Sequence, residues 1–108
     1  MIKVTFYKNS DGSYAGFQSL GHAGYSEHGS DIICAAVSVL VINTINSITE
    51  LTDDDIEVEA YENKGLIKCM LNNPSDKTIL FMESLLLGLN GIVNDNNGEY
   101  IKVIFKEV

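Results

Sequence analysis

The chain has 108 residues, of which 45% are hydrophobic and 20% are charged, and it carries 7 basic against 15 acidic side chains. This length and hydrophobic fraction predict one globular domain over residues 1–108 and argue against a disordered tail. The formal net charge of −8 disfavours a direct nucleic-acid binder, because such proteins rely on clustered Lys and Arg. A basic partner suits this charge better.

The N-terminal segment and the cysteines bear on the compartment. Residues 1–7 alternate in character and contain no continuous apolar core, so we expect no secretory signal. The longest apolar run, residues 32–42, is shorter than the ~20 residues that cross a bilayer. We therefore expect a cytoplasmic protein without membrane association. In that compartment the better expectation for Cys34 and Cys69 is two reduced thiols rather than a disulfide.

The first half of the chain predicts a hairpin, a loop and a helix. Alternation with a period of two indicates a strand over residues 2–7, and the turn residues 9–12 join it to a second strand over 13–20. Three glycines within residues 21–29 predict a loop. Apolar spacings of three and four then indicate a helix that has Ser30 or Asp31 as its N-cap and ends near Leu51.

The second half predicts another hairpin, a helix and a final strand. The hairpin strands cover residues 56–61 and 66–71, and the last strand covers 100–106. Between them a helix carries one apolar stripe and ends at the break formed by residues 94–98; the stripe consists of Ile79, Met82, Leu86, Leu89 and Val93. The order ββαββαβ predicts an α+β two-layer sandwich, with a mostly antiparallel sheet and two helices on one face.

The other face of this sheet suggests an oligomer. It would carry several apolar side chains among its charges, namely Tyr7, Tyr61, Leu66, Met70 and Ile104. Apolar patches of this kind often pair with a second subunit, so a homodimer is one hypothesis. A monomer with scattered surface hydrophobes is the alternative.

Residues 21–38, GHAGYSEHGSDIICAAVS, hold most of the candidate chemistry. Cysteine chemistry needs the thiolate, and helix N-termini favour anions, so a cysteine in a first helical turn is well placed. Cys34 falls there if the helix starts at residue 30 or 31. His22, in the preceding loop, could take the thiol proton and later give it to a leaving amine. Asp31 could orient His22, and Ser38 lies one turn beyond Cys34.

Each of these residues also has an ordinary structural interpretation. Cys34 could be a small core residue, and Cys69, which alternates with Ile67 and Leu71, is predicted to be one. His22 could simply form hydrogen bonds with the backbone of its loop, and Asp31 could act only as a helix cap. Ser38 could form a hydrogen bond with the backbone of its own helix. We expect His28 to be exposed.

The same residues offer little to a metal or a nucleotide. His22, His28, Asp31 and Cys34 include the donor types that zinc accepts, but their spacing matches no usual pattern of paired ligands. The glycine loop lacks both the GxGxxG arrangement and the lysine of a phosphate-binding loop. We therefore expect no cofactor and no metal.

The pair of motifs GHAGY and GSDIICAAVS resembles the ribosomal-processing cysteine protease (Prp) family of Firmicutes, which often has Val where this chain has Ile33. The resemblance implies a cysteine endopeptidase that removes an N-terminal extension from the bacterial large-subunit ribosomal protein bL-twenty-seven. It implies Cys34 as nucleophile and His22 as general base and acid. The segment between them would cover the peptide; its candidate substrate-loop residues are Gly21, Ala23, Gly24, Tyr25 and Gly29.

The rival hypothesis is a non-enzymatic α+β protein-interaction module of the ribosome-assembly pathway, with Cys34 packed in the core. Together with the resemblance, the net charge suggests that the acidic chain attracts a basic ribosomal protein as its partner. Six of the fifteen acidic residues gather in one segment, namely Asp53, Asp54, Asp55, Glu57, Glu59 and Glu62. A solvated acidic surface explains that segment equally well.

Overall fold

The computed structural model describes residues 1–21 and 28–108, and for residues 28–31 and 96–97 it describes the backbone alone. Its elements confirm the predicted order ββαββαβ. They are β1 (Ile2–Lys8), β2 (Tyr14–Leu20), α1 (His28–Leu51), β3 (Asp55–Tyr61), the 3-10 turn η1 (Glu62–Lys64), β4 (Leu66–Asn72), α2 (Asp76–Ile92), the π-helical turn η2 (Val93–Asn97) and β5 (Ile101–Glu107).

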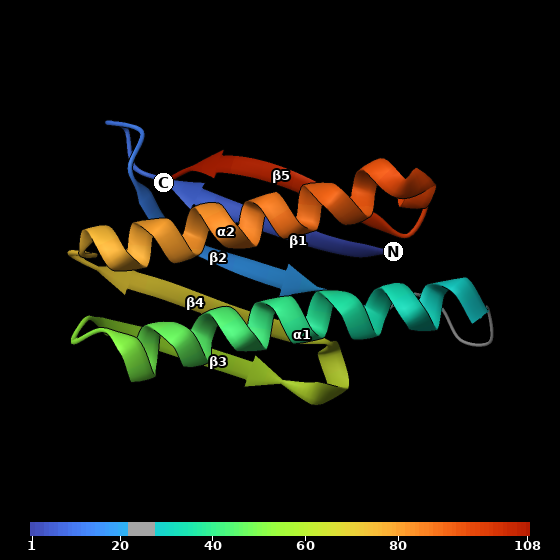
Figure 1. Ribbon diagram of the computed structural model, residues 1–108, viewed down its shortest axis with the longest axis horizontal. Helices are drawn as coiled ribbons and strands as arrows, with labels where there is room; N and C mark the ends of the chain where they lie inside the picture. The colour runs from blue at the N-terminus through green and yellow to red at the C-terminus, as the bar shows by residue number, and fades with distance from the viewer. Residues whose placement is uncertain (22–27) are drawn as a thin grey trace.

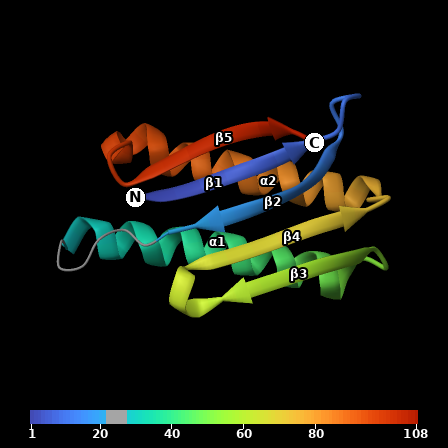
Figure 2. The ribbon, with the colours of Figure 1, turned by 180° about the vertical axis from the view of Figure 1, so that it is seen from behind.

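The strands form one sheet in the order β3-β4-β2-β1-β5. The pairs β1–β2, β2–β4 and β3–β4 are antiparallel, whereas β1 and β5 run parallel. Both helices cover one face of the sheet (Figure 1), and the view from behind shows the other face without a helix (Figure 2). The predicted two-layer α+β sandwich with a mostly antiparallel sheet is therefore confirmed.

The core lies between the sheet and the helices. The alternating residues Ile2, Val4 and Phe6 of β1 are buried, and the register places Phe6 opposite Phe17 and Phe17 opposite Cys69. Cys69 is 0% exposed, so its prediction as a core residue is confirmed. From the helices, α1 contributes chiefly Ile33, Val37, Val41 and Ile48, and α2 contributes Met82, Leu85 and Leu89.

The contact line of α2 differs from its predicted stripe. Thr78 and Leu85 are fully buried, whereas Ile79, Leu86 and Val93 of the predicted stripe are only partly buried against the core. The helix is therefore rotated slightly relative to the stripe. Helix α2 also packs closely against α1, where Gly88 lies against the Leu40 side chain: a Cβ at position 88 would be 3.1 Å from Leu40 Cδ1.

One predicted helix boundary is wrong. α1 begins at His28, so Ser30 and Asp31 lie inside its first turn and neither is the N-cap. Apolar spacing identifies a helix only where apolar residues recur, and residues 28–31 at the start of α1 carry no apolar side chain. The second helix ends close to its predicted break at residues 94–98, because α2 stops at Ile92 and the chain continues as the π-helical turn η2.

Helix α1 contains a longer apolar stretch than the sequence run of residues 32–42 indicates. Its stretch Ile32–Leu51 is long and apolar enough to cross a membrane by length and composition, although the uninterrupted apolar run within it is short. A core helix of a soluble protein passes the same test when it is mostly buried, and 28% of this stretch is buried. In this fold Val37, Val41 and Ile48 of the stretch pack into the core.

The start of α2 is tied to the loop before β3. Asp54 Oδ2 accepts hydrogen bonds from the Ser75 backbone N–H and hydroxyl, each at 2.8 Å, and from the Thr78 hydroxyl. These bonds, that of Thr78 foremost, hold the pKa of Asp54 below its usual 3.8. One residue of the acidic segment therefore has a structural role that the sequence pattern did not reveal.

Candidate active site

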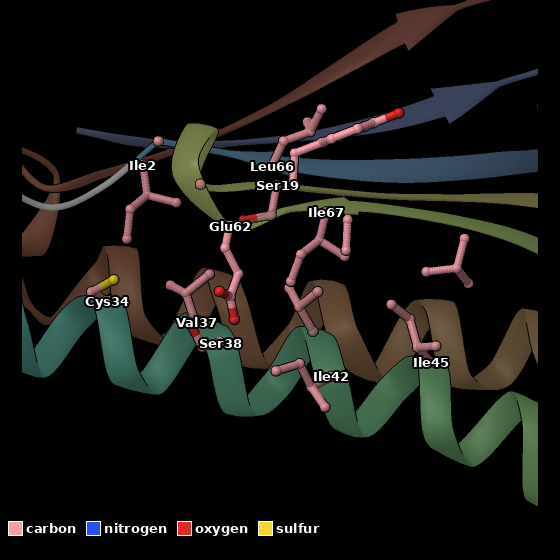
Figure 3. Close-up of a pocket in the computed structure, with 16 residues that line it drawn as sticks. Ile2, Ser19, Cys34, Val37, Ser38, Ile42, Ile45, Glu62, Leu66 and Ile67 are labelled. Carbon is pink, nitrogen blue, oxygen red and sulfur yellow. The ribbon is translucent and has the colours of Figure 1, made fainter.

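A groove of about 530 Å³ opens between α1 and the ends of the strands that pack beneath it (Figure 3). One wall is α1, and the other consists of β3, η1 and β4 together with Ile2 of β1, Ser19 of β2 and Gly21. The walls are mainly apolar; their side chains include Val37, Val41, Ile42 and Ile45 of α1 and Val58, Ala60 and Ile67 of the strands. The groove can therefore accept apolar side chains of a bound molecule.

Cys34 lines this groove. It is partly buried and packs against the core, and its sulfur atom points toward the sheet, where Ile2 lies (Figure 3). The two interpretations of Cys34 are thus not exclusive, because the side chain packs on the core and also borders open space. The position in the helix differs from the prediction. Cys34 is the seventh residue of α1, in the second turn, because the helix begins at His28.

This position changes how the thiol can be activated. The influence of a helix N-terminus falls off within the first turn. Cys34 lies beyond that turn, so activation of its thiol depends on a neighbouring base more than on the helix start.

Gly21 shows why a glycine stands directly before His22. Its φ is +106°, a conformation that L side chains rarely adopt, and a Cβ there would lie 2.5 Å from the Met1 carbonyl oxygen. Its N–H donates a hydrogen bond of 3.0 Å to the Gly65 carbonyl oxygen. Gly21 also lines the groove, so the chain leaves β2 at the edge of the candidate site.

The remaining predicted site residues divide into three groups. Ser38 lines the groove one turn after Cys34, as expected from their spacing. The prediction that Gly29 lies in the loop is wrong, because its backbone belongs to α1. Asp31 has a helical backbone and its side chain lies outside the described residues, as do His22, Ala23, Gly24 and Tyr25 altogether.

Glu62 is a groove residue that the sequence interpretation assigned only to a general acidic surface. It begins η1, and its side chain points from that turn toward α1 (Figure 3). The turn is closed by Gly65, which has φ +60° and donates its N–H to the Glu62 carbonyl oxygen at 3.0 Å. The Asn63-Lys64-Gly65 turn signal could have indicated that Glu62 sits at the end of a strand, but not that it faces a helix.

The predicted apolar patch on the bare sheet face is smaller than expected. Tyr61 and Leu66 line the groove. Tyr7, Met70 and Ile104 remain half-buried on the strands, and the Tyr7 hydroxyl donates a hydrogen bond of 3.4 Å to Gln18 Oε1.

Among the side chains that the structure describes, those of residues 1–21, 32–95 and 98–108, no group of three or more His, Cys, Asp or Glu is arranged to hold a metal ion. The described polar side chains of the groove are the Cys34 thiol, the Glu62 carboxylate and the hydroxyls of Ser19, Ser38 and Tyr61.

Comparisons with known proteins agree with this arrangement. The family model described as cysteine protease Prp matches residues 1–102. A ribosomal processing cysteine protease Prp of Staphylococcus aureus is 28% identical over 107 residues, which cover 98% of this chain and 100% of that protein.

Two solved structures of a ribosomal processing protease Prp from S. aureus have a closely similar fold. One is a complex with a substrate peptide; it has 25% sequence identity and a TM-score of 0.89, over 98% of this chain and 100% of that chain. The other holds a covalently linked product peptide and has 26% identity and a TM-score of 0.87 over the same shares.

Proposed function

Because this chain belongs to the Prp family of cysteine proteases, which process ribosomal proteins, we propose that it removes an N-terminal extension from ribosomal protein bL-twenty-seven. Cys34 is the proposed nucleophile and His22 the proposed general base and acid. The observation that carries this proposal is a thiol bordering an apolar groove large enough for a peptide segment. Membership of a protease family also sets aside the non-enzymatic interaction module.

The choice of Cys34 follows from comparing the two cysteines of the chain. Cys69 is fully buried, and burial raises the pKa of its thiol to about 11, so at neutral pH it stays protonated and out of reach of a peptide. A cysteine protease needs an accessible thiolate. Of the two thiols, that of Cys34 is the accessible one, because it is partly exposed in the groove.

The proposed reaction has two stages. The Cys34 thiolate attacks the scissile carbonyl while His22 carries the thiol proton, and collapse of the tetrahedral intermediate releases the amine, which takes that proton. Water, deprotonated by His22, then hydrolyses the thioester and frees the enzyme. His22 follows Gly21 directly in the chain, and Gly21 lines the groove. A covalent product complex is known for the S. aureus relative, as expected of an enzyme with a covalent step.

Other residues have supporting roles in this proposal. Asp31 would orient His22, and Ser38, in the groove one turn from Cys34, would hydrogen-bond the bound peptide. Gly21, Ala23, Gly24 and Tyr25 would belong to the segment that covers the peptide. The net charge of −8 would attract a basic ribosomal protein, which suits action in the cytoplasm, where ribosomes are assembled.

We further propose a homodimer that pairs through the bare sheet face (Figure 2), on which Tyr7, Met70 and Ile104 lie half-buried. Sedimentation at micromolar concentration tests this, and the monomer mass alone would contradict it.

The decisive experiment incubates the extended ribosomal protein with wild type, Cys34→Ala or His22→Ala and follows the substrate by mass spectrometry. Wild type should release the extension, and neither variant should. Cys69→Ala is the matched control, since it removes the other thiol and should retain cleavage wherever it stays folded by circular dichroism. Cleavage by Cys34→Ala at the wild-type rate would refute the nucleophile assignment.

A further inference from the structure

Strand β3 forms one edge of the sheet. It pairs with β4 on one side, and among the described residues no strand pairs with its other side (Figure 1). Six of its seven residues are exposed, and Ile56 is partly buried. An edge of this kind presents a row of unpaired backbone N–H and C=O groups, which an added extended segment can bind.

The side of β3 that faces α1 is apolar and only partly covered. Val58 lies opposite the buried Cys69 in the register, yet it is 46% exposed. Val58 and Ala60 line the groove, and across it Ile42 of α1 is 47% exposed. Helix α1 thus leaves apolar surface at this edge that alternate side chains of an added strand would cover.

The opposite side of β3 is acidic. Glu57 and Glu59 alternate with Val58 and Ala60, so they project from the other face of the strand, and both are exposed. The lysine closest to these two glutamates in the strand register points away from them. Lys68 lies opposite Glu59, but its ammonium sits 5.6 Å from the ring of Tyr7, which belongs to β1 on the far side of β4.

A second nearby lysine has a similar position. Lys64 Nζ lies 5.6 Å from the Tyr61 ring at the end of β3. Both lysines close to this edge are therefore placed over aromatic rings, and the carboxylates of Glu57 and Glu59 stay available to cations of a partner.

We propose that an extended segment of the substrate pairs with the free edge of β3 as an added strand, with apolar side chains toward α1 and alternating Lys or Arg side chains toward Glu57 and Glu59. This inference rests on the proposed protease function. Strand β3 runs into Tyr61 and η1, which line the same groove as Cys34, so the paired segment would flank the scissile bond. Seven residues of strand span about 23 Å, enough to pair with a segment of about six residues.

The charge on the edge gives this surface its selectivity. Acidic side chains on an edge strand discourage pairing with acidic or neutral strands, which protects against aggregation. A segment whose outward positions are basic turns the same charges into an attraction. The recognised feature is therefore the alternation of apolar and basic residues, not basic charge alone.

Binding of labelled eight-residue peptides to Cys34→Ala, measured by fluorescence anisotropy, tests the proposal without cleavage. A peptide alternating Val and Lys should bind at least tenfold more tightly than one of equal composition with four Val followed by four Lys. The double variant Glu57→Lys/Glu59→Lys should lose at least tenfold in affinity. Asp95→Lys/Glu99→Lys is the matched control; it makes the same charge change beside β5, at the opposite edge, and should lose much less.

Backbone methylation of the peptide distinguishes strand pairing from simple charge attraction. Methylating alternate amides in one register should abolish binding, because those N–H groups face β3, whereas methylating the other register should leave binding nearly unchanged. Equal effects in both registers, or equal binding of the alternating and block peptides, would overturn the inference. If wild type still cleaves the ribosomal protein in that case, the proposed function stands and only the strand pairing fails. If the peptides bind as expected but wild type does not cleave the ribosomal protein, the proposed function fails instead.

Discussion

Replacement of Gly21 by Ala places a methyl group against the backbone at the point where the chain leaves β2 and enters the candidate site. The new Cβ would lie 2.5 Å from the Met1 carbonyl oxygen, and the residue would have to hold a φ of +106°. Real Cβ atoms essentially never approach other atoms closer than 3.0 Å, so either Met1 or residue 21 must move. Movement would also strain the hydrogen bond that the Gly21 N–H donates to the Gly65 carbonyl oxygen.

The expected cost has two parts. A non-glycine residue held in such a backbone conformation costs about 1–3 kcal/mol. Relief of the overlap by a backbone shift adds about 1–3 kcal/mol, as in other cases of overpacking. We therefore expect a loss of about 2–6 kcal/mol, a large share of the ~5–15 kcal/mol that stabilises a typical domain.

Urea unfolding followed by circular dichroism measures this loss, and two other glycines separate its parts. Gly12 has φ +88°, and a Cβ on it would have no atom within 4 Å, so Gly12→Ala should show only the conformational cost. Gly98 has φ −62° and equally open space, so Gly98→Ala should be neutral or stabilising by about 0.4–1 kcal/mol. A Gly21→Ala variant no less stable than Gly12→Ala would refute the reasoning from the Met1 contact.

Two further predictions concern the thiols and the loop before β3. Native protein should take up one equivalent of iodoacetamide, at Cys34, while Cys69 reacts only after unfolding because it is fully buried with a pKa raised to about 11; rapid uptake of two equivalents would contradict this. The folded-state pKa of Asp54 lies below its usual 3.8, so its carboxylate stabilises the fold at neutral pH, and that contribution is lost as the pH falls through the folded pKa. Asp54→Asn should thus be less stable than wild type at pH 6, with the gap narrowing toward pH 3 in urea unfolding; a gap independent of pH would argue against this role.

The elements of this fold follow from short-range patterns in the sequence. Alternation of Ile2, Val4 and Phe6 marks a strand with one buried face, and the flanking Ile67 and Leu71 place Cys69 in the core. The motifs around His22 and Cys34 indicate the family to which the chain belongs. Such features can be read locally, because strand and helix periods decide which side chains share a face.

Helix boundaries and the shape of the site could not be read in this way. Residues 28–31 carry no apolar side chain, so apolar spacing could not show that the helix starts at His28. The hydrogen bonds from Ser75 and Thr78 to Asp54 join residues that are 21 and 24 positions apart in the chain. Glu62 faces α1 only because β3 pairs with β4 and ends beside the helix.

The sequence by itself therefore determined the order of elements, the core cysteine and the residues that carry the family resemblance. Only the tertiary structure decided that Cys34 borders an open groove, that Gly21 is confined by the Met1 carbonyl, and that β3 is an edge strand with an uncovered apolar side. The physical reason is that burial and edge position depend on which distant segments pack together. The parallel pairing of β1 with β5, nearly a full chain length apart, is the longest-range instance in this fold.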